Sequence, residues 1–545
     1  MKVWIRNTLL LAVCLGSMGL VVGRMLKNPT GPDPRSFDAA QFSQRGFLDV
    51  VDRVDQAFSN SWAAGKQTPA GRAQAHSIYR RISLALTGTI PSLEEIRALE
   101  SRGPGNHDQW FLSRLLEDRR TSDYFAERFA RVAVGVENGP FIIYRRHRLV
   151  SWLSDQIQAN RPYDQMVREM IAAEGIWTSH PAVNFITVTV DQNNKEQGPD
   201  EQKLAARVSR AFLGQRMDCV QCHNDMFGNR WKQKDFHQLA AFFAKAEMSM
   251  TGVRDDPEKH YEYRYLGRPA KEPVPPRVPF NSHLLPGDGP LRERLASWVT
   301  HPENRPFARM LVNRTWAFLF NRPLHKPLDD IPMNGPFPTG MEILADDLVS
   351  NRFDFHRLIR IIVATQAFQA ESRRPGNSAL TDGESSFQFA SFPLSRLRPE
   401  QVGASILQAS RLRTLDAESP TIVRLMRFFQ QKDFVTRYGD IGEDEFGDLP
   451  GTLPQRLVMM NGRLVHDRTK EDLVLNASTR IGALARDEQQ AVEMAYLTAL
   501  TRKPTREESD YFTQKLKEPS GSKRSQRMED LFWILMNSTE FSWNH

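Results

Sequence analysis

The chain has 545 residues, of which 40% are hydrophobic and 25% are charged, a balance typical of globular proteins. This length exceeds what one hydrophobic core usually serves, so it excludes a single small module and favours two or more domains. The formal net charge of +7 is too weak, for so long a chain, to indicate the clustered basic surface of a nucleic-acid-binding protein, and we expect no nucleic-acid partner.

An apolar segment near the N-terminus is the first element along the chain. Residues 8–23 are mostly apolar, follow Lys2 and Arg6, and are closed by Arg24. This order predicts a signal peptide or a membrane anchor over residues 1–27. No clear cleavage site precedes Arg24, and the apolar run is short for a full membrane span, so both alternatives stay open. In either case we expect the body to be exported to the periplasm, and an uncleaved segment 8–23 would anchor it to the inner membrane.

Helical patterns follow, separated by short breaks. The apolar residues around Ile82 recur on one helical face, and Gly88 predicts the end of that helix. Ser92 and Glu95 have the spacing of a capping box, which predicts the start of the next helix. Residues 184–190 are an exception, because they alternate and are rich in β-branched side chains, and they predict a short strand.

The helical pattern lapses once in the middle of the chain. Residues 249–288 are rich in proline and charge, which makes them poor helix and poor core. We therefore predict a helical domain over residues 36–248, a linker over 249–288 and a second helical domain over 289–545. The expected fold class is mainly α, with two helical domains joined by a Pro-rich segment after the N-terminal signal or anchor.

A single short motif carries recognisable chemistry. Cys219, Val220, Gln221, Cys222 and His223 form a CxxCH sequence, and the only other cysteine of the chain lies in the apolar N-terminal segment. CxxCH is the attachment motif of c-type haem. It predicts a covalent haem c, with Cys219 and Cys222 as thioether tethers and His223 as the proximal ligand of the iron.

Helices are expected on both sides of the motif. Residues 201–213 have a strong helical pattern that Gly214 ends, and Asp235 predicts the N-cap of the following helix. The motif is therefore predicted to lie on a loop between two helices. Phe227 and Trp231 are near enough in sequence to shield a porphyrin.

The two cysteines also allow three other interpretations. A plain disulfide between Cys219 and Cys222 needs no cofactor and is a usual state of paired cysteines in an oxidising compartment. A redox-active dithiol is less favoured, because no strand precedes the motif in a βαβ unit. A zinc site has three ligands in these cysteines and His223, but no second CxxC or spaced histidine pair is nearby to complete it. Covalent haem is the interpretation that the sequence favours.

The sixth ligand of such a haem is not fixed by the sequence. His237, Met248 and Met250 are weak candidates downstream of the motif. Each has a simpler interpretation, since methionine on a helix usually fills the core and a mid-helix histidine usually forms ordinary hydrogen bonds. Met226 is too close to His223 to reach the opposite face of a porphyrin. We expect an electron carrier whose sixth ligand is weak or displaceable.

Several segments resemble a known pair of families. Residues 211–243 resemble the signature of the planctomycete cytochrome-c-associated family known as domain of unknown function fifteen-forty-nine, and residues 80–96 and 160–172 fit the same family. Four later segments resemble its companion family, fifteen-fifty-three: residues 304–324, 352–372, 395–407 and 535–541. The resemblance implies an exported protein with a cytochrome-c-type site, and it brings no settled activity or catalytic residues.

The chain departs from the first family directly after the motif. The family usually continues CxxCH with Asp-His-Pro-Phe, whereas this chain has Asn224, Asp225, Met226 and Phe227. Asp225 cannot replace an imidazole on haem iron, so any family chemistry that depends on this second histidine is in doubt.

Paired carboxylates in the second half offer another candidate site. Asp329 and Asp330 lie on a turn bounded by prolines. Such pairs can do acid/base or metal work, but we expect the commoner arrangement, ion pairs with arginine.

These observations predict an exported monohaem c-type cytochrome-like protein of the cell envelope. It would transfer electrons or support an oxidoreductase, with a redox protein or another envelope protein as its partner. The alternative is a non-redox envelope interaction protein whose CxxC forms a structural disulfide. The sequence assigns no catalytic residue.

Overall fold

The computed structural model describes most of the chain after residue 37. The described residues are 38–545 except 103–104, 137–143, 191–197, 226–229, 250, 374–388, 416–418, 420, 440–441, 443–445, 447–450, 474 and 518–523. The predicted signal or anchor, residues 1–27, lies outside these limits. Among the helices within them, none combines the length and the hydrophobicity of a membrane span.

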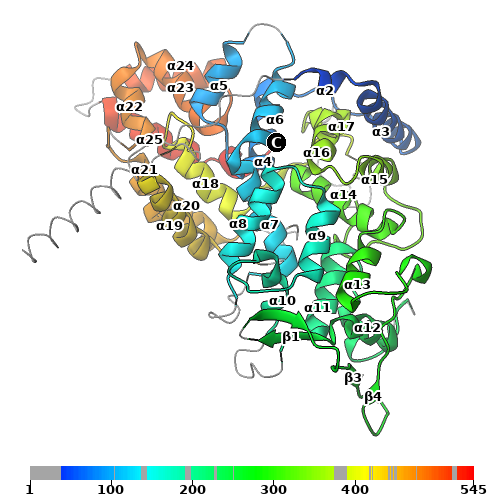
Figure 1. Ribbon diagram of the computed structural model, residues 1–545. Helices are drawn as coiled ribbons and strands as arrows, with labels where there is room; N and C mark the ends of the chain where they lie inside the picture. Colours follow the sequence, from blue (N-terminus) through cyan, green and yellow to red (C-terminus); the bar gives the residue numbers. More distant parts are fainter. Residues whose placement is uncertain are drawn as a thin grey trace, which may run out of the picture.

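Helices dominate the fold, which confirms the mainly α class (Figure 1). The helices before the middle segment are α2 (Ala40–Ser43), α3 (Arg45–Ala64), α4 (Ala75–Thr87), α5 (Leu93–Glu100), α6 (His107–Glu117), α7 (Arg119–Val134), α8 (Arg146–Gln158), α9 (Tyr163–Ala172), α10 (Asn184–Thr187), α11 (Glu201–Arg207) and α12 (Gln233–Ala240). Those after it are α13 (Leu291–Val299), α14 (Arg305–Phe320), α15 (Met341–Ser350), α16 (Phe355–Ala364), α17 (Gln366–Gln369), α18 (Pro399–Ala409), α19 (Thr421–Tyr438), α20 (Leu453–Asn461), α21 (Arg463–Thr469), α22 (Ala477–Leu484), α23 (Glu488–Leu500), α24 (Arg506–Lys517) and α25 (Arg524–Asn537).

The described strands form three small antiparallel pairs. β1 (Ala246–Ser249) pairs with β2 (Gly252–Asp255), and β3 (Glu262–Tyr263) pairs with β4 (Glu272–Pro273). β5 (Ser395–Arg396) pairs with β6 (Trp543–Asn544) and so places Asn544 beside Ser395, a residue far earlier in the chain. The strands therefore link segments and do not build a layer of the fold.

Local signals set the first helix boundaries as the sequence predicts. Gly88 ends α4 with φ +69°, a left-handed conformation that glycine adopts without strain. The Ser92 hydroxyl accepts a hydrogen bond from the Glu95 amide at 3.0 Å, and the Glu95 carboxylate accepts one from the Ser92 amide at 2.8 Å. The predicted capping box at the start of α5 is thus confirmed.

The prediction of a strand over residues 184–190 is wrong. Residues Asn184–Thr187 form the short helix α10. The Asn184 side chain accepts a hydrogen bond from the Arg145 amide at 2.6 Å and donates to the carbonyls of Trp177 and Pro181 at 2.9 Å, which holds the segment in a turn. Phe185 is fully buried, as are its neighbours on both sides, so the alternating sequence does not correspond to alternating exposure.

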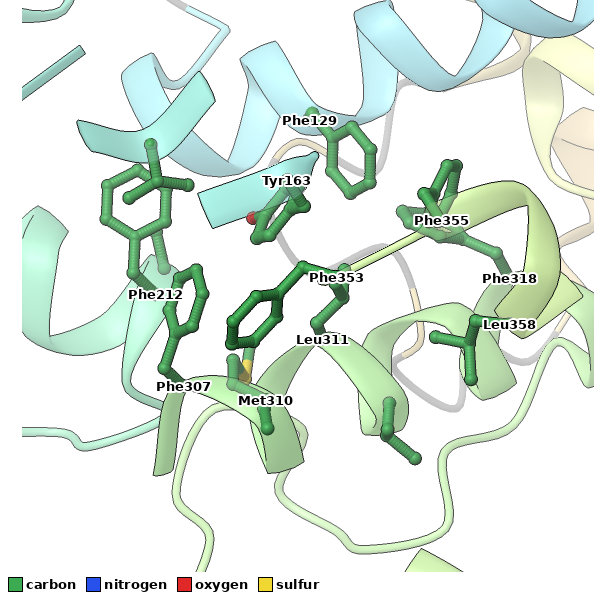
Figure 2. Close-up of a cluster of buried hydrophobic side chains, with 14 of the residues drawn as sticks. Phe129, Tyr163, Phe212, Phe307, Met310, Leu311, Phe318, Phe353, Phe355 and Leu358 are labelled. Atoms are coloured by element: carbon green, nitrogen blue, oxygen red, sulfur yellow. The ribbon is translucent and has the colours of Figure 1, made fainter. Parts of the chain in front are cut away.

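The larger of the two main cores lies between helices from both halves of the chain. Figure 2 shows Phe129 of α7, Tyr163 of α9, Phe307 and Phe318 of α14, and Phe355 of α16 within it. The Tyr163 ring stacks on Phe307 with 5.6 Å between ring centroids, and Phe129 lies 5.4 Å from Phe355. Aromatic contacts of this kind contribute about 0.5–1.5 kcal/mol each beyond their buried area. The halves before and after the middle segment therefore share one core.

The middle segment packs on this core. Val253, Tyr261 and Val274 are buried, and all three belong to the same cluster as the helices on either side. Residues 249–288 thus do more than connect two bodies, although the limits of the domains stay a prediction.

A second core lies among the last helices. Its buried residues come mainly from α18, α19, α22, α23 and α25, shown at the left of Figure 1. Leu84 of α4 and Ile90 also belong to it, whereas Ile82 and Leu86 of the same helix belong to the first core. Helix α4 therefore joins the two cores.

Candidate functional site

The CxxCH motif lies at the surface, on a tight turn. Helix α11 continues into a π-helical turn at Val208–Phe212, and after Gly214 the chain forms a 3-10 turn at Asp218–Gln221. Gly214 has φ +60°, and a side chain there would meet Met310 of α14 at 3.0 Å. Glycine is required at this bend for both reasons. The motif therefore lies between α11 and α12, as predicted.

The cysteines and the histidine of the motif face solvent, because residues between and before them are buried. Met217 and Val220 are buried in the first core, while Cys219, Cys222 and His223 are exposed. Both cysteines are free thiols, so the structure contains no disulfide between them. The result is a pair of accessible thiols beside an accessible imidazole.

The His223 imidazole has one nitrogen occupied. Its Nδ1 lies 2.8 Å from the Asn224 carbonyl oxygen. A carbonyl oxygen only accepts, so Nδ1 donates this bond, and in the neutral imidazole Nε2 carries the lone pair. Metal-binding histidines generally show this arrangement, in which one nitrogen donates to a fixed acceptor and the other faces the metal.

Helix α12 lies against the motif and holds it by hydrogen bonds. The Gln233 amide donates to the carbonyls of Gln221 and Cys222 at 3.1 and 3.0 Å. His237 donates from Nε2 to the Gln221 carbonyl at 2.9 Å. These three bonds fix the backbone on which the two cysteines lie. The helix begins at Gln233, two residues before the predicted N-cap, and the Asp235 carboxylate accepts from the Lys232 amide at 2.9 Å inside its first turn.

Three tyrosines of the middle segment surround His237. The Tyr261 hydroxyl lies 2.8 Å from His237 Nδ1, and because Nε2 carries the proton, Tyr261 donates this bond. The Tyr263 ring stacks on the imidazole with 3.4 Å between centroids, and Tyr265 approaches it edge-on at 5.7 Å. Burial lowers the pKa of His237 and outweighs the bond to Gln221, so this histidine is neutral.

The candidate sixth ligands differ in position. Both nitrogens of His237 hold hydrogen bonds, so this residue would have to break them to bind iron. Met248 lies on β1, partly buried against the first core. Met226 and Met250 lie outside the described residues, as does Phe227. Trp231, predicted to shield a porphyrin, is 7% exposed and packs against Phe280 in the core.

The carboxylate pair of the second half lies close to the motif. Asp329 accepts hydrogen bonds from Arg210 at 2.6 Å and from Arg216 at 2.7 Å, and Asp330 accepts one from Arg230 at 3.1 Å. Burial opposes ionisation of Asp329, but the two arginines outweigh it and lower its pKa. The prediction of an arginine ion-pair cluster is confirmed. It ties the turn after α14 to the segments on both sides of CxxCH.

The residues that hold this site in place were not predicted from the sequence. Gln233, Tyr261 and Tyr263 hold the motif, but none was a candidate residue. The one available signal was the spacing of Tyr261, Tyr263 and Tyr265, which puts alternate side chains of an extended segment on one face.

The motif holds the groups that covalent attachment of a haem would use. Within the described ranges, no cluster of three or more histidine, cysteine or acidic side chains could hold a metal ion. Two free exposed thiols and an imidazole with an available Nε2 are the groups that thioether attachment and proximal ligation of a haem require.

Family comparisons cover both halves of the chain. Residues 53–248 match the family described as PSCyt2, Protein of unknown function (DUF1549), and residues 291–437 match PSD1, Protein of unknown function (DUF1553). The chain carries both domains. The two families that the sequence resembles are thus confirmed, and residues 535–541 lie beyond the second match. No curated protein and no solved structure is similar to the chain. The CxxCH motif lies in the first domain, and Asp329 and Asp330 lie in the second.

Proposed function

We propose that this protein is an exported monohaem c-type cytochrome-like protein of the cell envelope, which transfers electrons or supports an oxidoreductase. The observation that carries the proposal is the state of the CxxCH motif, with two free exposed thiols beside a histidine whose Nδ1 is already occupied. Cys219 and Cys222 would hold the haem covalently, and His223 would be the proximal ligand through Nε2. The haem, when bound, supplies a one-electron redox centre.

The protein's own residues keep this site in place. Gln233 and His237 hold the backbone of the motif, and the Asn224 carbonyl fixes the orientation of His223. Fixed ligands change their geometry little between oxidation states, which favours electron transfer. Because the motif is exposed, a group held there is accessible to a redox partner or another envelope protein. The apolar segment 8–23 supports export and a periplasmic position of the body.

Haem content tests the proposal directly. The full chain should be expressed with its export signal and with cytochrome maturation factors, because haem attachment takes place outside the cytoplasm. We expect a red protein whose haem stays attached in acid–acetone. The double variant Cys219→Ala with Cys222→Ala should lose it. Cys14→Ala is the matched control, since it removes the remaining cysteine of the chain and should retain the haem.

A colourless wild-type protein with an oxidised Cys219–Cys222 pair would refute the cytochrome proposal. It would support the alternative, an envelope interaction protein with a structural disulfide.

Binding of carbon monoxide distinguishes a haem that carries electrons from one that catalyses a reaction. A carrier has both axial positions filled by protein, whereas an enzyme leaves one open. We propose a carrier with a weak or displaceable sixth ligand. Spectra of the reduced protein should therefore show slow or incomplete binding of carbon monoxide, and rapid, complete binding would indicate an open, catalytic site.

A further inference from the structure

A two-stranded hairpin lies directly against the CxxCH motif. Strands β3 and β4 form it, and Figure 1 shows it next to α12. The Tyr263 hydroxyl donates to the Gln221 carbonyl at 3.3 Å, and the Leu266 amide donates to the Gln233 side chain at 3.4 Å. The same Gln233 side chain donates to the Cys222 carbonyl at 3.0 Å. The hairpin is therefore part of the surface around the two cysteines, and these bonds fix its position.

The outward face of the hairpin carries two neighbouring positive charges. Tyr263 faces α12, since its ring stacks on His237 with 3.4 Å between centroids. Successive side chains of an extended segment point to opposite faces, so Arg264 points away from α12. Lys271 comes directly before the residue that pairs with Tyr263, and it lies on the same outward face as Arg264. Like charges at neighbouring cross-strand positions are unfavourable without a nearby anion.

Positive charge predominates on this part of the surface. Five exposed basic side chains belong to the start of α12 and to the hairpin: Lys232, Lys234, Arg264, Arg268 and Lys271. None of the five forms an ion pair with a residue that the structure describes. The same segments contain three acidic residues, Asp235, Glu262 and Glu272, and the undescribed residues 226–229 next to the motif contain none. The surface thus has a net positive charge and attracts anionic groups of other molecules.

An exposed leucine lies among these charges. Leu266 is at the turn of the hairpin and is 79% exposed, the largest value among the large hydrophobic residues that the structure describes. An apolar side chain surrounded by charged ones is typical of a protein interface, whereas a membrane-binding face presents several large apolar side chains. We call the leucine and the five basic residues the hairpin surface: Lys232, Lys234, Arg264, Leu266, Arg268 and Lys271.

We infer that the hairpin surface is the docking site of an acidic partner protein next to the CxxCH motif. Charge complementarity speeds the encounter of the two proteins and orients them, and Leu266 packs against an apolar group of the partner. The acidic character of the partner follows from the hairpin surface. Its nature as a redox protein rests on the proposed function, because a protein docked here lies beside the haem site.

Binding of an acidic peptide tests the docking site without haem. The probe is a fluorescein-labelled peptide in which a leucine lies between two runs of glutamate, and its fluorescence anisotropy is measured with the full-length protein at low ionic strength. We expect saturable binding that weakens as salt is added. The triple variant Arg264→Gln, Arg268→Gln and Lys271→Gln should weaken binding about tenfold, and Leu266→Ser should weaken it several-fold at unchanged charge.

A second triple variant with the same change in net charge is the matched control. Arg437→Gln, Arg463→Gln and Arg506→Gln change arginines of α19, α21 and α24, whose side chains are 64%, 86% and 93% exposed. This variant should bind the peptide as wild type does. The inference is overturned if the peptide does not bind saturably, or if both triple variants weaken binding equally. It is also overturned if phosphatidylglycerol vesicles bind through the hairpin surface and the peptide does not.

Small oxidants test whether the docking site lies beside the haem. The reduced, haem-loaded protein is mixed with ferricyanide, an anion, or with tris(phenanthroline)cobalt(III), a cation, and its oxidation is followed by stopped-flow absorption. The hairpin triple variant should slow oxidation by ferricyanide several-fold without slowing oxidation by the cobalt complex, and the control variant should change neither rate. Unchanged ferricyanide rates in the hairpin variant would overturn the position beside the haem. A colourless protein would refute the cytochrome proposal, and peptide binding would still decide the docking site.

Discussion

His237 occupies a position where one side chain joins three segments. It lies on α12, donates to the Gln221 carbonyl of the CxxCH turn at 2.9 Å and accepts from the Tyr261 hydroxyl at 2.8 Å. The residue is fully buried, and Tyr263 covers its face. The His237 imidazole thus connects the middle segment to the CxxCH motif, so His237 has a structural role.

Substitution of His237 separates this structural role from iron ligation. His237→Phe keeps an aromatic ring for the stack on Tyr263 but removes both hydrogen bonds, and the free energy of unfolding should fall by about 2 kcal/mol or more. The visible spectrum of attached haem should stay the same, because His223 remains in place. Chemical denaturation and absorption spectra measure the two effects. Loss of a low-spin spectrum in this variant would instead identify His237 as the sixth ligand.

A second buried histidine makes the stability depend on pH. Burial of His356 and the nearby Arg360 charge lower its pKa from 6.5 to about 4. Between these values the unfolded chain binds a proton that the folded protein does not. The stabilisation is therefore complete above pH 6.5 and is lost as the pH falls towards 4. A shift of this size corresponds to about 3 kcal/mol.

Removing the titratable group should flatten this dependence. In His356→Gln, the free energy of unfolding should fall less between pH 6.5 and pH 4 than in the wild type, as measured by urea denaturation at several pH values. His283→Gln changes an exposed histidine and should follow the wild-type curve. Equal slopes in all three proteins would contradict the assignment.

At the scale of elements, α14 is the helix around which the first core forms. Nearly all of its residues are buried, so it has no polar face. Trp316 stacks on Phe320 with 4.3 Å between centroids and on Phe58 of α3 at 5.5 Å. A helix surrounded by protein on all sides depends on tertiary packing for its stability.

Shortening Trp316 should therefore be strongly destabilising. Trp316→Ala leaves a cavity among these rings and should lower the free energy of unfolding by about 3–5 kcal/mol. Trp316→Phe keeps most of the packing and also removes an indole N–H that has no hydrogen-bond partner here, so it should cost less than about 1.5 kcal/mol. Denaturant titration followed by far-UV circular dichroism gives both values. Similar losses in the two variants would show that packing is not the cause.

At the scale of the whole molecule, buried charges connect the two family domains. Glu400 of α18 accepts hydrogen bonds from Arg128 of α7 at 3.0 Å and from Arg398 at 2.9 Å. Burial opposes ionisation of Glu400, but these arginines outweigh it and lower its pKa. The carboxylate is therefore the shared counter-charge of two buried guanidinium groups.

Neutralising Glu400 should destabilise the whole protein. Glu400→Gln leaves the two arginines without this charge and should lower the free energy of unfolding by about 3–5 kcal/mol. Asp433→Asn breaks an exposed ion pair with Arg437 and should change it by less than about 1 kcal/mol. Chemical denaturation compares them, and equal effects would contradict a special role for the buried cluster.

The first family domain should not fold without the rest of the chain. Residues 38–248 alone would expose the surface that α13, α14 and α16 cover in the shared core. We expect a soluble fragment to bind hydrophobic dyes and show rapid amide hydrogen exchange, and co-expression of residues 249–545 to restore protection. A fragment that unfolds cooperatively and protects its amides by itself would show that the domains are independent.

The sequence by itself determined what depends on neighbouring residues. The mainly α class follows from periodicity, the end of α4 from Gly88, and the start of α5 from the Ser92–Glu95 capping box, since each needs contacts only within a few residues. The CxxCH motif could likewise be recognised in the sequence, because haem attachment would depend on the spacing of its residues.

Only the tertiary structure decided what depends on distant residues. The same local patterns gave a strand at residues 184–190, where the Asn184 side chain bonds in fact hold a helical turn. Periodicity predicts which face of a helix is buried, but it does not predict which other helix packs on that face. The sequence therefore could not predict that helices before and after the middle segment share one core. The hydrogen bonds of His237 arise because folding brings separate segments together.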